Sequence, residues 1–295
     1  MGLVAELSTG RSLEWRWVHR LSRLLVTAIL CAFAIAFAVW SLLGQVQLDA
    51  LAYDVAAERL RNGRELYAPG SMNHADVYRY TPWFAVLWGL VQPWGGLLLL
   101  LSSTVACIYV TWTTRHALPV SLMLSAMLLS SMSNGNVHPL LVATILWSRD
   151  RWTGAVWVAI AASIKAVPGI YALVYLGRRE WVRFAVSVGV MALTALPLLA
   201  FDLSLYPTDA GQRVILWGTP LYVPVVLVGC VLTVLCARTR YAWLVASAVV
   251  ILAMPRFWPY DLAWLLVAAV PAHGAMSPRT PSRTRWFHRP TLRRS

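Results

Sequence analysis

Charged residues are scarce in this sequence, and acidic residues are the scarcest. Only 13% of the 295 residues are charged, with 12 Asp and Glu against 25 Lys and Arg, and a single lysine among the latter. A soluble domain of this length carries roughly twice that share of charge. Hydrophobic residues make up 59% of the chain. The shortage of charge excludes an ordinary soluble domain and predicts an integral membrane protein.

The sequence has few cysteines, and none of them has the spacing of a metal site. Cys31, Cys107, Cys230 and Cys236 lie in or beside apolar stretches, where cysteine behaves as a small hydrophobic residue. Nowhere does the sequence group His, Cys and carboxylates at ligand spacing, and it has no Asp-x-Asp. We therefore expect no disulfide and no resident cofactor, while a metal requirement stays open.

What the chain does have is a series of long apolar stretches separated by short polar turns. Residues 24–43 are free of charge over twenty positions, enough for a helix to cross a bilayer. Arginines precede this stretch, but its length and the lack of a small-residue cleavage site favour an uncleaved anchor over a signal peptide. An all-α, multi-pass helical bundle with about ten crossings is predicted. The further apolar stretches are residues 97–114, 118–132, 137–148, 152–177, 183–200, 220–236, 241–253 and 262–272.

The basic residues are concentrated on one side of the predicted crossings. With the N-terminus inside, eighteen of them fall on the inner side and seven at the outer side, as the positive-inside rule requires. The net charge of +13 therefore reflects membrane topology and not nucleic-acid binding. We expect a plasma-membrane protein with both termini in the cytoplasm. Residues 1–23 form a basic N-terminus, residues 24–275 the membrane domain, and residues 276–295 a basic tail, expected to be disordered.

Residues 48–82 form the only sizeable polar loop, and they hold five of the twelve acidic residues. Residues 48–61 are expected to form a helix that lies at the outer membrane surface. Asn62-Gly63 is a suitable end for it, because both residues tolerate the left-handed conformation.

Asp49 is the unusual residue of this predicted helix. Asp54, Glu58 and Arg61 share one face and are expected to be solvated. Asp49 falls with Tyr53 on the opposite, largely apolar face. A carboxylate there costs free energy unless it has a partner or a task.

Two helix breaks bring further polar groups to the outer side. Residues 83–92 are too short to span and stop at a proline, so they predict a half-helix. Residues 152–177 are long for one span and short for two. Lys165 and Pro168 interrupt them, and because proline removes a backbone donor we expect a helical hairpin broken there.

Five short motifs on the predicted outer side then occur in a recognisable order. This order resembles glycosyltransferase family 87, the polyprenol-phosphate-sugar-dependent membrane transferases of the GT-C type. Members of that family usually have Tyr-Pro-Pro at the second motif, and their chains are commonly longer, with more spans. The motifs are Asp49-x-x-x-Tyr53, Tyr80-Thr81-Pro82, Gly135-Asn136-Val137-His138, Ser163-Ile164-Lys165-Ala166-Val167-Pro168 and Pro255-Arg256-Phe257-Trp258-Pro259-Tyr260-Asp261.

The resemblance implies a GT-C-like catalytic domain that takes a sugar from a polyprenyl-phosphate donor on the outer face of the membrane. The sugar is usually mannose, and arabinofuranose in some members. The expected acceptor is a glycolipid or polysaccharide of the cell envelope. The resemblance assigns the general base to Asp49, and one base with a phosphate leaving group implies single displacement with inversion.

This assignment makes physical sense for the residues present. A carboxylate whose pKa is raised by apolar surroundings is a competent base for an acceptor hydroxyl. The leaving polyprenyl phosphate is negatively charged, so the protein should supply cations. The candidate substrate-binding residues are Tyr53, Arg79, Tyr80, Asn136, His138, Lys165, Arg256, Tyr260 and Asp261.

Each candidate also has a structural alternative. Asp49 could cap its helix, and Lys165 could snorkel or bond carbonyls freed by the break. Asn136 and His138 could simply satisfy a turn, and Arg79 could bind lipid headgroups.

The last motif also has two interpretations. Arg256 and Asp261 could form an ion pair with each other. Alternatively, they could contact a phosphate and a sugar hydroxyl.

Two other classes of protein compete with a transferase. A transporter or flippase would line a pathway with polar residues, but no internal repeat with matching broken segments is visible. A non-catalytic protein that binds lipid-linked sugars is the second rival. The enzyme hypothesis requires Asp49, Lys165 and Arg256 to converge on one outer cavity.

Overall fold

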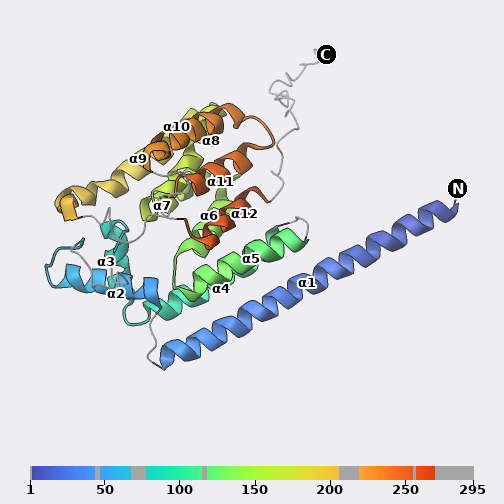
Figure 1. Ribbon diagram of the computed structural model, residues 1–295, viewed down its shortest axis with the longest axis horizontal. Coiled ribbons are helices and arrows are strands. Elements are labelled where there is room, and N and C mark those ends of the chain that lie inside the picture. The colour runs from blue at the N-terminus through green and yellow to red at the C-terminus, as the bar shows by residue number, and fades with distance from the viewer. Residues whose placement is uncertain are drawn as a thin grey trace, which may run out of the picture.

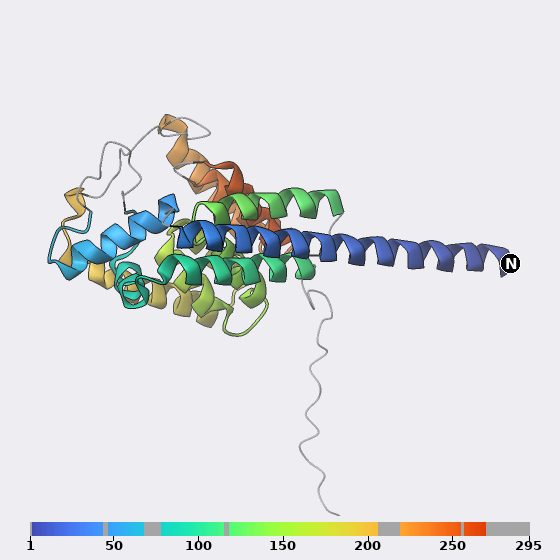
Figure 2. The ribbon, with the colours of Figure 1, turned by 90° about the horizontal axis from the view of Figure 1, so that it is seen from below.

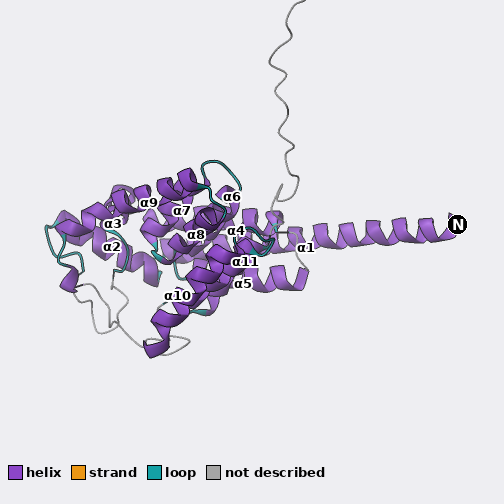
Figure 3. Ribbon diagram, turned by 90° about the horizontal axis from the view of Figure 1, so that it is seen from above, coloured by secondary structure: helices purple, strands orange, loops and turns teal. Residues whose placement is uncertain are grey.

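Every regular element that the structure describes is helical. Figure 3 shows helices and loops only in this part of the chain. Long apolar stretches without strand-like alternation favour helices, which satisfy their own backbone hydrogen bonds. The predicted all-α fold class is confirmed. The computed structural model describes residues 2–43, 47–67, 78–114, 118–205, 219–254 and 257–269.

The first helix, α1 (Gly2–Leu42), is the longest element, and its N-terminal part extends beyond the rest of the bundle (Figures 1 and 2). It exceeds the predicted crossing at residues 24–43 because the basic segment before that crossing continues the same helix. The later part packs against α4 (Gly95–Thr113), where Arg23 Nη2 donates to the Thr114 carbonyl at 3.1 Å.

Three helical segments are long and apolar enough to cross a membrane, namely Arg20–Leu42, Gly95–Thr113 and Trp181–Ala200. Helices of eleven residues reach only about 16 Å, roughly half the hydrocarbon thickness. The number of about ten crossings therefore stays a prediction. The remaining elements of the bundle are α5 (Leu118–Ser133), α6 (His138–Ser148), α7 (Gly154–Ile164), α9 (Trp181–Ala195), η2 (Leu196–Ala200), η3 (Leu203–Leu205), α10 (Thr219–Cys236) and α11 (Ala242–Leu252).

The apolar stretch at residues 152–177 is divided in two, as predicted. Lys165 follows the end of α7 in an extended conformation, and the chain resumes as a 3₁₀ helix, η1 (Val167–Tyr171), continued by α8 (Ala172–Gly177). Pro168 lies in the first turn of η1, where its missing N–H does not interrupt a longer helix. The break therefore places Lys165 at the bend.

The last predicted crossing, at residues 262–272, is wrong as a single helix. The described part consists of a 3₁₀ helix, η4 (Pro259–Trp264), and a four-residue helix, α12 (Leu265–Ala268). Pro259 opens η4 after an extended residue, which favours a tight first turn. The predicted tail at residues 276–295 lies outside the described residues.

Two short helices lie at one end of the bundle (Figure 1), which we name the α2 end. Helix α2 (Leu48–Arg61) has the predicted bounds, and Gly63 after it has a φ of +61°. Helix α3 (Pro82–Val91) begins with a proline, which is tolerated because the first N–H of a helix has no internal partner.

Asp54 joins these two helices, so its predicted place on a solvated face is wrong. Its Oδ1 accepts hydrogen bonds from Trp88 Nε1 at 2.7 Å and from Gln92 Nε2 at 2.8 Å. Arg61 Nη2 donates to Gln92 Oε1 at 2.8 Å, and Glu58 is exposed as predicted. Asp54 therefore serves to hold α3 against α2.

We name the opposite end of the bundle the arginine end. Here α6, α8 and α10 end, and Arg149, Arg178 and Arg238 follow within two residues. Buried aromatic rings fill the core beside this end, with the Tyr171 ring 5.8 Å from that of Trp243.

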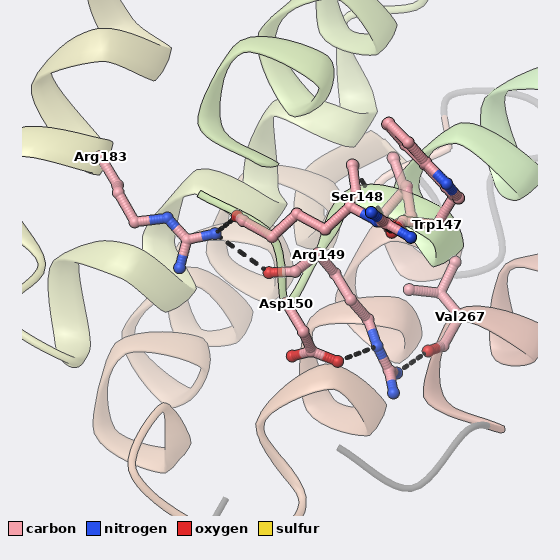
Figure 4. A network of polar contacts seen from close by, with 8 residues as sticks. Trp147, Ser148, Arg149, Asp150, Arg183 and Val267 are labelled. Atoms are coloured by element: carbon pink, nitrogen blue, oxygen red, sulfur yellow. Dashed lines mark hydrogen bonds and ion pairs between the residues drawn. The ribbon is translucent and has the colours of Figure 1, made fainter. Parts of the chain in front are cut away.

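A polar network fixes the arginine end (Figure 4). Arg149 is buried; its Nε donates to Asp150 Oδ2 at 3.1 Å and its Nη1 to the Val267 carbonyl. Arg183 Nη2 donates to the carbonyls of Arg149, at 3.3 Å, and of Arg151. A buried guanidinium requires acceptors for its five N–H groups. Most of the acceptors here belong to the backbone.

Candidate active site

Asp49 lies in the first turn of α2 and faces the turn at residues 134–137. Its backbone N–H donates to the Asn134 carbonyl at 2.9 Å, and its Oδ2 accepts a hydrogen bond from Asn136 Nδ2 at 2.8 Å. The N-cap residue of the helix is Gln47. The alternative role of Asp49 as a cap is therefore wrong, and its carboxylate instead makes a contact between distant segments.

Gly135 allows α2 to approach this turn. Its φ is +70°, a backbone conformation that favours glycine. A Cβ atom at this position would lie 2.6 Å from Gln47 Oε1, 2.9 Å from Gln47 Cβ and 3.2 Å from Ala50 Cβ. The start of α2 therefore packs directly on the backbone of Gly135, and this brings Asp49 within reach of Asn136.

Asn136 is buried and uses both ends of its amide. Oδ1 accepts a hydrogen bond from the His138 N–H at 2.9 Å, while Nδ2 donates to Asp49. Asn136 therefore satisfies the turn, as its structural alternative predicts, and it also holds Asp49. The bond with the His138 N–H orients the amide that positions the Asp49 carboxylate.

Three ionisable side chains meet beside this turn. Asp261 Oδ1 lies 3.5 Å from His138 Nδ1 and 3.9 Å from Lys165 Nζ. Asp261 and His138 are buried, whereas the Lys165 side chain is 23% exposed. Lys165 therefore stands at the open side of the cluster. The predicted partner of Asp261, Arg256, lies outside the described residues.

Asp261 owes its position to η4. Its Oδ2 accepts a hydrogen bond from the Trp258 N–H at 2.8 Å, across the first turn of that helix. Tyr260, in the same turn, has its ring 5.9 Å from Lys165 Nζ and 5.6 Å from the His138 ring. The tight turn of η4 thus positions both the Asp261 carboxylate and the Tyr260 ring beside Lys165 and His138.

Aromatic residues from α2, from α3 and from the segment just before α3 pack together beside Asp49. Tyr53 is fully buried, and its hydroxyl donates to the Tyr80 hydroxyl at 3.0 Å. The Tyr53 ring packs edge-on against Tyr80, Phe84 and Trp88. Such packing holds the ring and fixes the face of α2 that turns inward.

Thr81 ties these aromatic residues to the bend at Lys165. Its Oγ1 donates to the Ser163 carbonyl at 2.6 Å, and Ser163 lies two residues before Lys165. The Tyr-Thr-Pro step therefore connects two of the sequence motifs directly. Threonine can make this bond, and a proline at that position could not.

The charges around Asp49 act on it in opposite directions. Burial raises the pKa of the Asp49 carboxyl, and the Asn136 hydrogen bond and the positive charges of Lys165 and Arg79 partly oppose this. Burial likewise raises the pKa of Asp261, against the charge of Lys165. Burial and the Asp49 charge raise the pKa of Tyr260. Asp49, Arg79, Lys165 and Tyr260 therefore share one electrostatic environment.

Several buried polar atoms of this cluster have no hydrogen-bond partner among the described residues. They include both ring nitrogens of His138, Asp261 Oδ1 and Gln47 Oε1. A buried polar atom without a partner costs free energy, and such atoms mark places where a ligand or water can bind. The ring nitrogens of His138 thus lack hydrogen-bond partners, although its backbone N–H satisfies the turn.

The structure brings together all the predicted site residues that it describes. Asp49 and Tyr53 come from α2, while Arg79 and Tyr80 immediately precede α3. Only Arg256 lies outside the described residues. We name this set the candidate active site: Asp49, Tyr53, Arg79, Tyr80, Asn136, His138, Lys165, Tyr260 and Asp261.

Two contributing residues were missed at the level of sequence. Gln47 provides the cap position and a buried amide oxygen at the turn, and Trp264 packs its ring 4.7 Å from the His138 ring. Neither has a distinctive local pattern. Their roles depend on which segments meet in the fold.

The described residues contain no group of three or more His, Cys, Asp or Glu that could hold a metal ion. Comparison with protein-family models, with curated proteins and with solved structures found no match to this chain. The geometry itself offers a half-buried carboxylate, a lysine at the open side, an arginine within electrostatic reach, and unpaired polar atoms. This arrangement can accept a proton and bind an anion.

Proposed function

We propose that the protein is a membrane glycosyltransferase that moves a sugar, mannose in the first instance, from a polyprenyl-phosphate donor to a glycolipid or polysaccharide of the cell envelope. The observation that carries this proposal is the convergence at the α2 end. A carboxylate with a raised pKa, Asp49, shares its environment with the cations Lys165 and Arg79. Transfer of a sugar from a phosphate donor to a hydroxyl acceptor requires a base and cations of this kind.

In the proposed reaction Asp49 acts as the general base. It accepts the proton of an acceptor hydroxyl while that oxygen attacks the anomeric carbon of the donor sugar. The bond between the anomeric carbon and the phosphate oxygen breaks, and polyprenyl phosphate leaves with the electron pair. The attack comes from the face opposite the leaving group, so the anomeric configuration inverts.

Lys165 and Arg79 are the proposed binding groups for the donor phosphate. Lys165 Nζ lies 3.9 Å from Asp261 Oδ1, so its charge is held at the site before the donor arrives. Since the charge of the leaving phosphate grows during transfer, a fixed cation stabilises the transition state more than the ground state. His138 and Asp261, whose buried polar atoms lack hydrogen-bond partners among the described residues, are the proposed binding groups for sugar hydroxyls.

The surface of the molecule supports membrane embedding. Large apolar side chains are exposed along α1, α9, η2 and α10, including Leu199 at 82% and Val182 at 77%. Soluble monomers rarely expose so much contiguous apolar surface. We propose about ten crossings, both termini in the cytoplasm and the α2 end on the outer face of the plasma membrane. The arginine end then lies inside, as the positive-inside rule requires.

The test is transfer of radiolabelled mannose from polyprenyl-phosphate-mannose to endogenous lipid acceptors in membranes that contain the protein. Asp49→Asn keeps an acceptor oxygen for Asn136 but cannot take a proton. We expect transfer to fall by about 10²-fold or more. Glu58→Gln is the matched control, because Glu58 lies on the exposed face of the same helix. It should transfer at the wild-type rate.

Equal transfer by wild type and Asp49→Asn, at equal protein levels, would remove Asp49 from the role of base. If the wild type is inactive with the mannosyl donor, the same assay with a polyprenyl-phosphate-arabinofuranose donor tests the alternative activity, arabinofuranosyl transfer. Inactivity with both donors would favour a non-catalytic protein that binds lipid-linked sugars.

A further inference from the structure

The arginine end contains a pocket that is separate from the candidate active site. It has a volume of about 320 Å³ and lies where the turn after α8 meets the turn between α10 and α11. None of its residues takes part in the proposed transfer. Its lining is polar and mostly cationic: Arg178, Glu180, Ala237, Arg238, Thr239 and Arg240.

Two of its arginines link the two turns through one nitrogen each. Arg178 Nε donates to the Ala237 carbonyl at 2.9 Å, and Arg238 Nε donates to the Gly177 carbonyl at 3.1 Å. These reciprocal bonds hold the pocket walls together and fix both guanidinium planes. A guanidinium has four further N–H groups on its Nη atoms, and these make no hydrogen bond to any described residue. They remain available to an anion.

The three arginines of the pocket form no ion pair with any described residue. Glu180, its one acidic residue, is paired with Arg183 at 2.6 Å. Among the described residues, no carboxylate lies within ion-pair distance of Arg178, Arg238 or Arg240. Three arginines that line one pocket, none of them paired with a carboxylate among the described residues, form a site for a phosphate, whose oxygens accept several N–H groups at once.

The neighbouring surface indicates where that phosphate comes from. Trp181 and Val182, at the start of α9, are 60% and 77% exposed, and Leu235, at the end of α10, is 69% exposed. These apolar faces begin directly beside the pocket. A soluble anion would leave these apolar side chains uncovered, whereas the acyl chains of a phospholipid would cover them.

We propose that this pocket binds the phosphate of an anionic phospholipid, whose acyl chains lie against α9 and α10. The proposal rests on the membrane embedding proposed above and not on sugar transfer. Arginines at helix ends also orient a protein in the membrane, but that role needs charge alone. The additional feature is that the three arginines line one pocket and that reciprocal bonds fix the guanidinium planes of Arg178 and Arg238.

The test measures lipid retention by native mass spectrometry on the full chain in detergent, with phosphatidylglycerol or phosphatidylcholine added. The wild type should retain phosphatidylglycerol in preference to phosphatidylcholine. The double variant Arg238→Gln/Arg240→Gln should lower phosphatidylglycerol retention by about tenfold. Arg151→Gln is the matched control, since it removes a charge at the same end but outside the pocket, and it should retain the lipid as the wild type does.

Two results would overturn the proposal. One is equal retention by the wild type and the double variant. The other is displacement of the lipid by inorganic phosphate at the same concentration, which would make the ligand a free anion. If the double variant does not fold, Arg240→Gln alone carries the test, because Arg240 forms its hydrogen bond and its ring contact with the neighbouring Tyr241 and does not join the two turns. The readout is bound lipid, so this outcome and that of the transfer assay are independent.

Discussion

The two ends of the bundle use polar side chains in different ways. At the arginine end, Arg149 and Arg183 donate mainly to backbone carbonyls. At the α2 end, ionisable and polar side chains also contact one another, and His138 and Asp261 keep buried polar atoms without a hydrogen-bond partner among the described residues. A ligand can replace a contact between side chains, but it cannot replace a backbone contact without disturbing the fold. The arginine network therefore maintains the structure, whereas the α2 end keeps the polar atoms that the proposed function assigns to a ligand.

The largest expected effect on stability is at the arginine end. Arg149→Ala should lower the free energy of unfolding by about 3 kcal/mol, because it leaves the Asp150 carboxylate and the Val267 carbonyl without their buried donor. Denaturation of the purified protein in detergent measures this. Arg151→Ala, at an exposed position, should change it by less than about 0.5 kcal/mol. A folded Arg149→Ala protein that has lost transfer would contradict the division between the two ends.

Two glycines with positive φ allow a matched test at the α2 end. Gly135→Ala places a Cβ against Gln47, whereas Gly63→Ala meets no atom within 4 Å. In both variants, backbone strain should lower the free energy of unfolding by about 1 kcal/mol. Only Gly135→Ala should also reduce transfer, by about tenfold, because the start of α2 must move away from Asn136. Equal transfer by the two variants would show that this close approach does not position Asp49.

The pH dependence of transfer should reveal the titration of the α2 end. Asp49 is a base only when deprotonated, so transfer must fall as the pH drops through its pKa. Burial raises that pKa above the ordinary value of 3.8, so the acid limb should lie above that pH. The rate should fall about tenfold per pH unit below the limb. The residual rate of Asp49→Asn, measured over the same range, should lack this limb. If Asp49→Asn kept the acid limb of the pH–rate curve, the titration would belong to another group.

The smallest expected effect is a gain in stability at the arginine end. Arg179 has a φ of +61°, a conformation in which glycine is unstrained. Arg179→Gly should therefore raise the free energy of unfolding by about 0.5–1 kcal/mol, measured by the same denaturation. Arg179→Ala removes the same charge but keeps the strain, so it should show no gain. A gain in both variants would mean that charge repulsion, and not backbone strain, limits this turn.

Features that depend on local chemistry could be predicted from the sequence. The bounds of α2 follow from its periodicity and from Asn62-Gly63, and the break near Lys165 follows from Pro168. The apolar stretches predicted the other helices within a few residues, apart from the start of α1 and the segment at 262–272. There the proline of η4 and its short capped turn determine the structure.

Contacts between distant segments could not be predicted. The sequence placed the candidate residues on one side of the membrane but did not indicate that Lys165 would lie beside Asp261, or that Asp54 would hold Trp88. Such pairs depend on how two helices are rotated against each other, which periodicity leaves open. The role of Gln47 could not be predicted for the same reason, because it depends on the contact between the start of α2 and Gly135.

Lys165 also makes the candidate active site chemically addressable. It is the chain's only lysine, it lies at the bend after α7, and its side chain is partly exposed. An amine-selective reagent therefore has one internal target in the whole polypeptide, apart from the terminal amine. A reporter dye, a crosslinker or a membrane-impermeant tag attached there would mark a single known position beside Asp261, without any engineered cysteine.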